Sequence, residues 1–358
     1  MALGPRRGRS EYNGRVRGGA YRWIACAVAC ASGMLAPAQT GDARATGAEI
    51  IKIAHSAPDD SPWGVGMAGV ASHWRKTLVG REVKLYPGAT AGDEARMLTL
   101  CKRGSLHAIG VADFFAGQEV PEFNVAGYPF LFDNDAEAHH VVDTVLLPRL
   151  QAIVAEHDLE LYALGELGWL QLASVAPASG RDLAGLRVRI PENPFHAAVV
   201  SALGGTPVKT SMLDAAESLE QGRANAILHT SVFLFATGWY GKVRHVYETR
   251  LLYSTAFVLV NRRFWRGLPA PVRQKLVPGG AEIVRVSRTQ VPALSSVVRE
   301  SLVQNGVQMH ALGAAEERAL RARVEAGRPA IEAALGPRGR AILVEARRAL
   351  ARLRSGRP

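Results

Sequence analysis

Two arginines, two residues apart, carry the clearest chemical signal in this chain. Arg187 and Arg189 lie in the run GLRVRIPENP, residues 185–194, between aliphatic residues. A strand places residues two apart on the same face, so both side chains are expected to point the same way. Burying two unpaired guanidinium groups is prohibitive, which favours solvent for at least one of them. An arginine at the end of the strand, beside the IPENP turn, can hold a carboxylate through two parallel N–H bonds.

Patterns typical of enzymes do not account for the chain. It has no G-x-S-x-G elbow, no phosphate-binding Walker loop and no H-E-x-x-H sequence. His139 and His140 are adjacent and would point in different directions on a helix, and the other histidines are isolated in the sequence, so none forms a metal-ligand pattern. Cys101 falls on the apolar side of an expected helix. We therefore predict no catalytic centre, no metal site and no cofactor, and a protein that is not an enzyme.

Aromatic clusters offer material for a binding cleft. They are YPFLF at 128–132, Trp169, and GWY at 238–240. Each can equally belong to a hydrophobic core, and composition alone does not separate the two roles.

The elements that must position these residues alternate between strand and helix. AEIIKIAHSA predicts a buried strand, a helix follows to about Leu78, and GREVKLYPG predicts a second strand. Asp93 is placed to cap a helix that ends at Gly104, and LHAIGVA predicts a third strand. From about Gln290 onward the pattern is mostly helical. Strands and helices in this order indicate an α/β sheet with both faces covered.

An internal echo predicts two lobes. Gly80-Arg-Glu-Val-Lys-Leu followed by Pro87 recurs as Gly185-Leu-Arg-Val-Arg-Ile followed by Pro191, and the stretch from Gly104 to Ile109 recurs at 222–227. Two landmarks in the same order suggest two similar α/β units. Two such lobes commonly bind a small molecule in the cleft between them.

The N-terminus is typical of an exported protein. Residues 1–38 combine six arginines, one glutamate, the apolar stretch WIACAVACASGMLA and an APA site ending at Ala38. We predict a signal peptide over 1–38 and a periplasmic location, with an uncleaved anchor as the alternative. This segment holds five of the eleven net positive charges, and the remaining six are spread along the chain. Such a distribution does not favour nucleic-acid binding.

Seven modest motifs in a fixed order resemble one known family. They are YPGATAGDEARML, KRGSLHAIG, YPFLFDND, GELGW, DLAGLRVRIPENP, ALGGTPVKTSMLDAAESLEQG and VNRRFWRGLP. The order resembles the DctP-type periplasmic solute-binding proteins of tripartite ATP-independent periplasmic (TRAP) transporters, over roughly residues 50–276. The resemblance implies two α/β lobes joined by hinge strands and a long helix, with C-terminal helices, closing on a ligand.

The resemblance also assigns roles to individual residues. Arg189 occupies the position of the family's carboxylate-binding arginine, and Arg187 that of a lysine. Two departures remove polar partners, because Leu170 stands where a second arginine is often found and Asn225 replaces an aspartate. A small or rather apolar carboxylate is therefore expected in place of a sugar acid. The other ligand-binding candidates carried over by position are His55, Glu94, Trp169, Met212, His229 and Trp239.

The resemblance therefore predicts a binding protein that captures a small organic anion and delivers it to TRAP membrane permease subunits. The alternative is a secreted sensor of the same fold acting on a membrane receptor. We expect a monomer or homodimer. Lobe I is expected to comprise 49–167 and 255–294, and lobe II 168–254 and 295–358.

Overall fold

One mixed sheet runs through the part of the chain that the computed structural model describes, residues 49–356. The predicted signal peptide lies outside these residues. The sheet has the order β2-β1-β3-β8-β4-β7-β5-β6, and β9 pairs with β8. The strands are β1 (Ile50–His55), β2 (Glu82–Tyr86), β3 (Ala108–Ala112), β4 (Leu159–Ser174), β5 (Arg187–Ile190), β6 (Thr206–Lys209), β7 (Ala226–His229), β8 (His245–Asn261) and β9 (Gln308–Ala311).

Helices cover the sheet and confirm the predicted α/β class. The α-helices are α1 (Pro62–Thr77), α2 (Glu94–Lys102), α3 (Asp113–Ala116), α4 (Asp135–Val141), α5 (Leu147–Val154), α6 (Pro194–Ala202), α7 (Ala215–Glu220), α8 (Ser231–Ala236), α9 (Arg262–Gly267), α10 (Ala270–Gln304), α11 (Ala314–Ala334) and α12 (Gly336–Arg354). Shorter helical turns are η3 (Pro121–Val125), η4 (Val142–Leu146), η5 (Ala155–His157) and η6 (Trp239–Gly241). None of the helices within residues 49–356 has both the length and the apolar character needed to cross a membrane.

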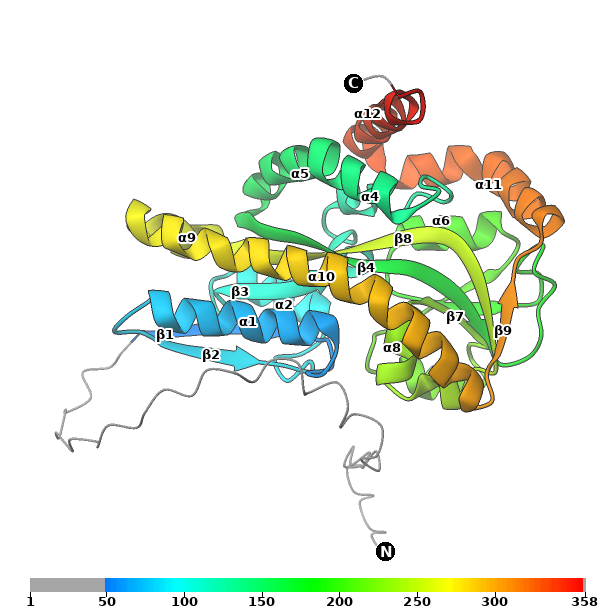
Figure 1. Cartoon of the computed structure of the whole chain (residues 1–358), viewed down its shortest axis with the longest axis horizontal. Helices are drawn as coiled ribbons and strands as arrows, with labels where there is room; N and C mark the ends of the chain where they lie inside the picture. Colours follow the sequence, from blue (N-terminus) through cyan, green and yellow to red (C-terminus); the bar gives the residue numbers. More distant parts are fainter. Residues whose placement is uncertain (1–48, 357–358) are drawn as a thin grey trace, which may run out of the picture. The chain divides into compact units, whose positions relative to one another are not determined.

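Two long strands connect the halves of the sheet. β4 and β8 pair antiparallel from Leu159 opposite Asn261 to Ser174 opposite His245. Near one end β8 also pairs with β3, and near the other β4 pairs with β7. The group β1–β3 therefore lies on one side of these strands and the group β5–β7 on the other (Figure 1).

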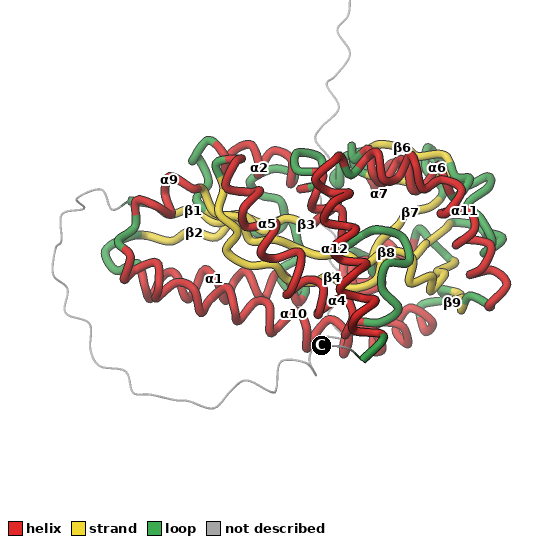
Figure 2. The backbone as a smooth tube through the Cα atoms, turned by 90° about the horizontal axis from the view of Figure 1, so that it is seen from above, coloured by secondary structure: helices red, strands yellow, loops and turns green. Residues whose placement is uncertain are grey.

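Alternating side chains supply a core on each face of the sheet. In β8, Val258 and Val260 pack in a cluster with Trp74 of α1 and Ile283 of α10. Leu259, between them in sequence, faces the opposite cluster, which includes residues of α2 and α6. This period of two is the one expected for a strand buried on both faces. Figure 2 shows α1 and α10 on one side of the strands and α2 and α6 on the other.

The internal echo corresponds to matching local structure. GREVKL and GLRVRI form β2 and β5, each pairing in parallel with its neighbours. Gly80 and Gly185, which precede them, have φ of +83° and +77°, a region that favours glycine. The repeated glycines therefore mark the same turn in both halves.

The C-terminal third contacts both halves. Helix α10 has 35 residues, contains Pro278 and Pro292, and packs against α1, β4 and α8. Helix α11 packs on α6, whereas α12 turns back onto η3, α4 and η4. The segment 295–358 was predicted to belong to lobe II, but α12 packs on elements from the segment predicted for lobe I. The exact lobe boundaries stay a prediction.

Candidate functional site

Arg189 is a buried cation without an acidic partner among residues 49–356. It lies in β5, held between β6 and β7, and is 3% exposed. Its Nε donates to Thr210 Oγ1 at 3.1 Å, and its Nη2 donates to the Thr210 carbonyl at 2.7 Å. Burial lowers its pKa to about 10, so the guanidinium stays charged near neutral pH. Because a guanidinium has five N–H donors, this one keeps capacity for an anion.

Arg187 has a structural role. It is exposed, and its Nε and Nη2 donate to the carbonyls of Arg223 at 3.0 Å and Gly222 at 2.7 Å. These carbonyls follow α7, so Arg187 satisfies acceptors beyond the end of that helix. Of the two arginines in this strand, Arg187 therefore has a structural role, whereas Arg189 is a buried cation that forms no ion pair within residues 49–356.

A small cavity of about 80 Å³ lies between the two halves of the sheet. The loop Ser56–Trp63 and the ends of β3 and α3 line it from one half, and Met212, the end of β7 and helix α8 line it from the other. The lining is mostly apolar. Its polar members are Ser56, Ser61, Glu94, Glu166, His229 and Thr230. Arg189 is not part of the lining, but its charge acts on both Glu94 and His229.

Glu94 connects three segments of the first half. It opens α2, directly after the predicted N-cap Asp93, whose side chain accepts from the Arg96 N–H at 2.8 Å. The Glu94 carboxyl accepts from the Ser56 hydroxyl and, at 2.8 Å, from the Ala112 N–H. Burial raises the pKa of Glu94 to about 7, so its charge changes near neutral pH.

His229 ends β7 and is 4% exposed. Its ring stacks on Phe233 with a centroid distance of 3.7 Å and meets Phe114 edge-on at 5.6 Å. The Thr230 N–H donates to Nδ1 at 2.9 Å, and Nε2 has no hydrogen-bond partner within the described range 49–356. Burial first, and then the charge of Arg189, lower the pKa of His229 to about 3.

The other candidates divide between the cavity and elsewhere. Met212 lines the cavity. His55 is buried at the end of β1, just before the lining residues Ser56 and Ala57, and neither ring nitrogen has a partner in the described part of the chain. Trp239 does not reach the cavity, since it lies in an apolar core of the second half with its ring edge-on to Phe233.

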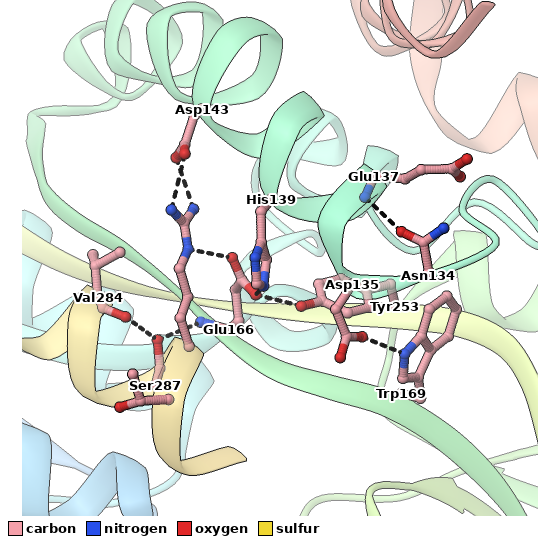
Figure 3. Close-up of polar contacts among 12 residues, drawn as sticks. Asn134, Asp135, Glu137, His139, Asp143, Glu166, Trp169, Tyr253, Val284 and Ser287 are labelled. Carbon is pink, nitrogen blue, oxygen red and sulfur yellow. Dashed lines mark hydrogen bonds and ion pairs between the residues drawn. The ribbon is translucent and has the colours of Figure 1, made fainter. Parts of the chain in front are cut away.

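Trp169 lies outside the cavity as well. Its indole N–H donates to Asp135 Oδ1 at 2.7 Å (Figure 3). It lines an adjoining, larger space of about 470 Å³. The reason is in the strand, because β4 shifts register between Glu166 and Gly168 and again between Leu170 and Leu172. These irregularities interrupt the simple alternation of faces, and Leu167 borders both spaces whereas Trp169 lines only the larger one.

Sequence reasoning missed an ionic network around the buried Glu166, which lies beside both spaces. Glu166 is 2% exposed and meets His139 Nε2 at 2.7 Å, Arg288 Nε at 2.8 Å and the Tyr253 hydroxyl (Figure 3). Arg288 also donates to both carboxylate oxygens of Asp143, at 2.7 and 2.8 Å. The network joins α4, η4, β4, β8 and α10. No local signal reveals it, since the partners of Arg288 lie more than a hundred residues away in sequence.

These features define a class of protein. A sheet in two halves, long strands and a long helix crossing between them, and a cavity beside a buried cation are the architecture of a two-lobe solute-binding protein. The chain belongs to the bacterial extracellular solute-binding protein family 7, the DctP family of TRAP transporters, which its residues 53–331 match.

Relatives and solved structures agree with this assignment. The 2,3-diketo-L-gulonate-binding periplasmic protein YiaO of Escherichia coli is 25% identical over 64% of this chain and 70% of its own length. The C4-dicarboxylate-binding periplasmic protein DctP of Rhodobacter capsulatus is 26% identical over 65% and 71%. A TRAP solute-binding protein from Chromohalobacter salexigens, solved with D-glucuronate, has a TM-score of 0.78 at 18% identity, covering 84% of this chain and 99% of that one. The predicted family and two-lobe fold are confirmed.

Proposed function

We propose that this protein is the extracytoplasmic solute-binding component of a TRAP transporter. It captures a small organic anion between its lobes, without chemical turnover, and delivers it to the membrane permease subunits. After export and removal of the signal peptide it works in the periplasm. The observation that carries the proposal is Arg189, a buried guanidinium that is hydrogen-bonded to Thr210 and forms no ion pair within the described residues. The names of the relatives support it, since all three describe proteins that bind organic acids.

The ligand is a small carboxylate with a largely apolar body. Sites for drug-sized ligands have volumes of ~300–1,000 Å³, far larger than this cavity. The mostly apolar lining offers few partners for a polyhydroxylated chain. A hydroxyl that is buried without a partner costs free energy, which disfavours sugar acids in this site.

Closure of the lobes gives the ion pair its selectivity. One lobe binds first, and closure then adds the contacts of the other lobe, so the ligand must supply the free energy that favours the closed state. An uncharged ligand would leave Arg189 buried and unpaired, which penalises it relative to an anion. Titration calorimetry with a panel of carboxylates on the wild type and Arg189→Ala tests the proposal.

Glu94 is expected to make carboxylate binding dependent on pH. Its pKa of about 7 means that the side chain is largely neutral at pH 6 and ionised at pH 8. The ionised form repels a bound carboxylate and competes for Arg189, so affinity should fall about tenfold from pH 6 to pH 8. Calorimetry at pH 6, 7 and 8 measures this change, because the ligand itself stays ionised throughout.

Glu94→Gln is the matched variant for this test. It keeps the shape of the side chain and removes the titration, so its affinity should be nearly the same at all three pH values. A fall with pH that persists in Glu94→Gln would assign the effect to another group.

A further inference from the structure

The ring of His229 is fixed in place by its neighbours. It stands at the last position of β7, paired with Gln171 of β4, and the next residue, Thr230, caps helix α8 through its hydroxyl. Phe233 stacks on one face of the ring and Phe114 approaches edge-on. Backbone and ring are thus both held, and the ring cannot turn its free nitrogen toward solvent without repacking these aromatic residues.

The hydrogen-bonding character of this ring is also fixed. Since the Thr230 N–H donates to Nδ1 at 2.9 Å, Nδ1 carries no hydrogen, and the neutral ring places its hydrogen on Nε2. Nε2 is buried and has no partner within residues 49–356. A buried donor without an acceptor is costly, so this nitrogen favours any ligand or water that brings an acceptor.

The surroundings keep His229 a donor at physiological pH. Its low pKa, caused by burial and by Arg189, rules out the protonated ring near neutral pH. A ligand group that meets Nε2 must therefore accept a hydrogen bond. A ligand ammonium would face both this donor and the positive charge of Arg189, and it would be rejected.

We infer that His229 is a specificity-determining residue, whose Nε2–H donates to an uncharged acceptor on a carboxylate ligand, such as a ketone oxygen. This inference rests on the proposed function, with Arg189 holding the carboxylate. The ligand class is then a small oxo acid with an apolar body, preferred over the unsubstituted acid and over the amino acid of the same skeleton.

The test compares three acids of one skeleton by titration calorimetry: 3-methyl-2-oxobutanoate, 3-methylbutanoate and valine. The wild type should bind the oxo acid about tenfold more tightly than the unsubstituted acid, because one more hydrogen bond is made, and should not bind valine. His229→Phe keeps the aromatic stacking and lacks the N–H, so the two carboxylates should bind it equally. His229→Gln keeps a donor and should retain part of the preference.

Each result has a defined meaning. The role of His229 is overturned if the wild type does not bind the oxo acid more tightly than the unsubstituted acid. It is also overturned if His229→Phe shows the same preference for the oxo acid as the wild type. If these acids do not bind the wild type but another carboxylate of the panel does, only this inference fails; if no carboxylate of the panel binds, the proposed function fails as well. If carboxylates bind and Arg189→Ala abolishes binding while His229→Phe changes nothing, only this inference fails. Melting curves identify a variant that does not fold, and His229→Leu then serves as the donor-free replacement.

Discussion

Replacing Arg189 by alanine is expected to weaken carboxylate binding about thirtyfold or more. The ion pair would form at a buried guanidinium, and truncating one partner of such a pair costs about 2–5 kcal/mol of binding free energy. Titration calorimetry with any carboxylate that binds the wild type in the micromolar range measures the loss. Arg189→Lys should give an intermediate result, since lysine keeps the charge and loses the planar pair of donors.

Arg187→Ala provides the matched control. It removes an arginine from the same strand, but one whose hydrogen bonds go to the carbonyls of Gly222 and Arg223. Its ligand affinity should stay within about twofold of the wild type. Equal binding by the wild type and Arg189→Ala would show that the carboxylate is held elsewhere.

The stability of Arg189→Ala separates a ligand-binding role from a structural one. A buried guanidinium without an acidic partner costs free energy in the ligand-free protein. Its removal should leave the melting temperature unchanged or raise it, even though two hydrogen bonds to Thr210 are lost. A large fall in melting temperature would mean that Arg189 mainly supports the fold.

The sequence allowed the repeated, local features to be predicted. Strand alternation, the cap at Asp93 and the paired glycines at Gly80 and Gly185 depend on neighbouring residues only, and these elements form as expected. Local periodicity makes Arg187 and Arg189 equivalent, and only the family resemblance distinguished them. Their different surroundings arise only in the folded protein, where Arg187 contacts the segment after α7 and Arg189 contacts Thr210.

The features that could not be predicted depend on irregular strands and distant partners. β4 shifts register on both sides of Trp169, and Gly168, with a φ of +86°, marks one of the shifts, but a glycine does not tell which side chains line the cavity. The network at Glu166 forms only in the folded protein, because Arg288 meets partners that lie 122 and 145 residues away in the sequence. The unpartnered nitrogen of His229 is likewise a product of packing, since a lone histidine in sequence is more often structural.

Arg288→Ala is expected to lower the free energy of unfolding by about 3 kcal/mol. Glu166 would remain buried, with only its contacts to His139 and the Tyr253 hydroxyl left. Hydrogen bonds with Asp143 raise the pKa of Arg288, so it is a permanent cation in this network. Chemical denaturation of the ligand-free protein measures the change. The control is Arg285→Ala, one turn earlier on α10, whose partner Glu282 is exposed, and its unfolding should match the wild type.

A double variant tests whether charge burial is the cause. Combining Arg288→Met with Glu166→Gln removes both charges, and glutamine can still hydrogen-bond to the neighbouring polar groups, so the pair should be more stable than Arg288→Met alone. If the two changes simply add, the residues act independently and the network is not a unit. Recovery in the double variant would instead show that Glu166 and Arg288 fasten α10 to β4 as a pair. The long helix that contacts both halves of the protein would then be held to the sheet by a partly buried ion pair beside the cavity.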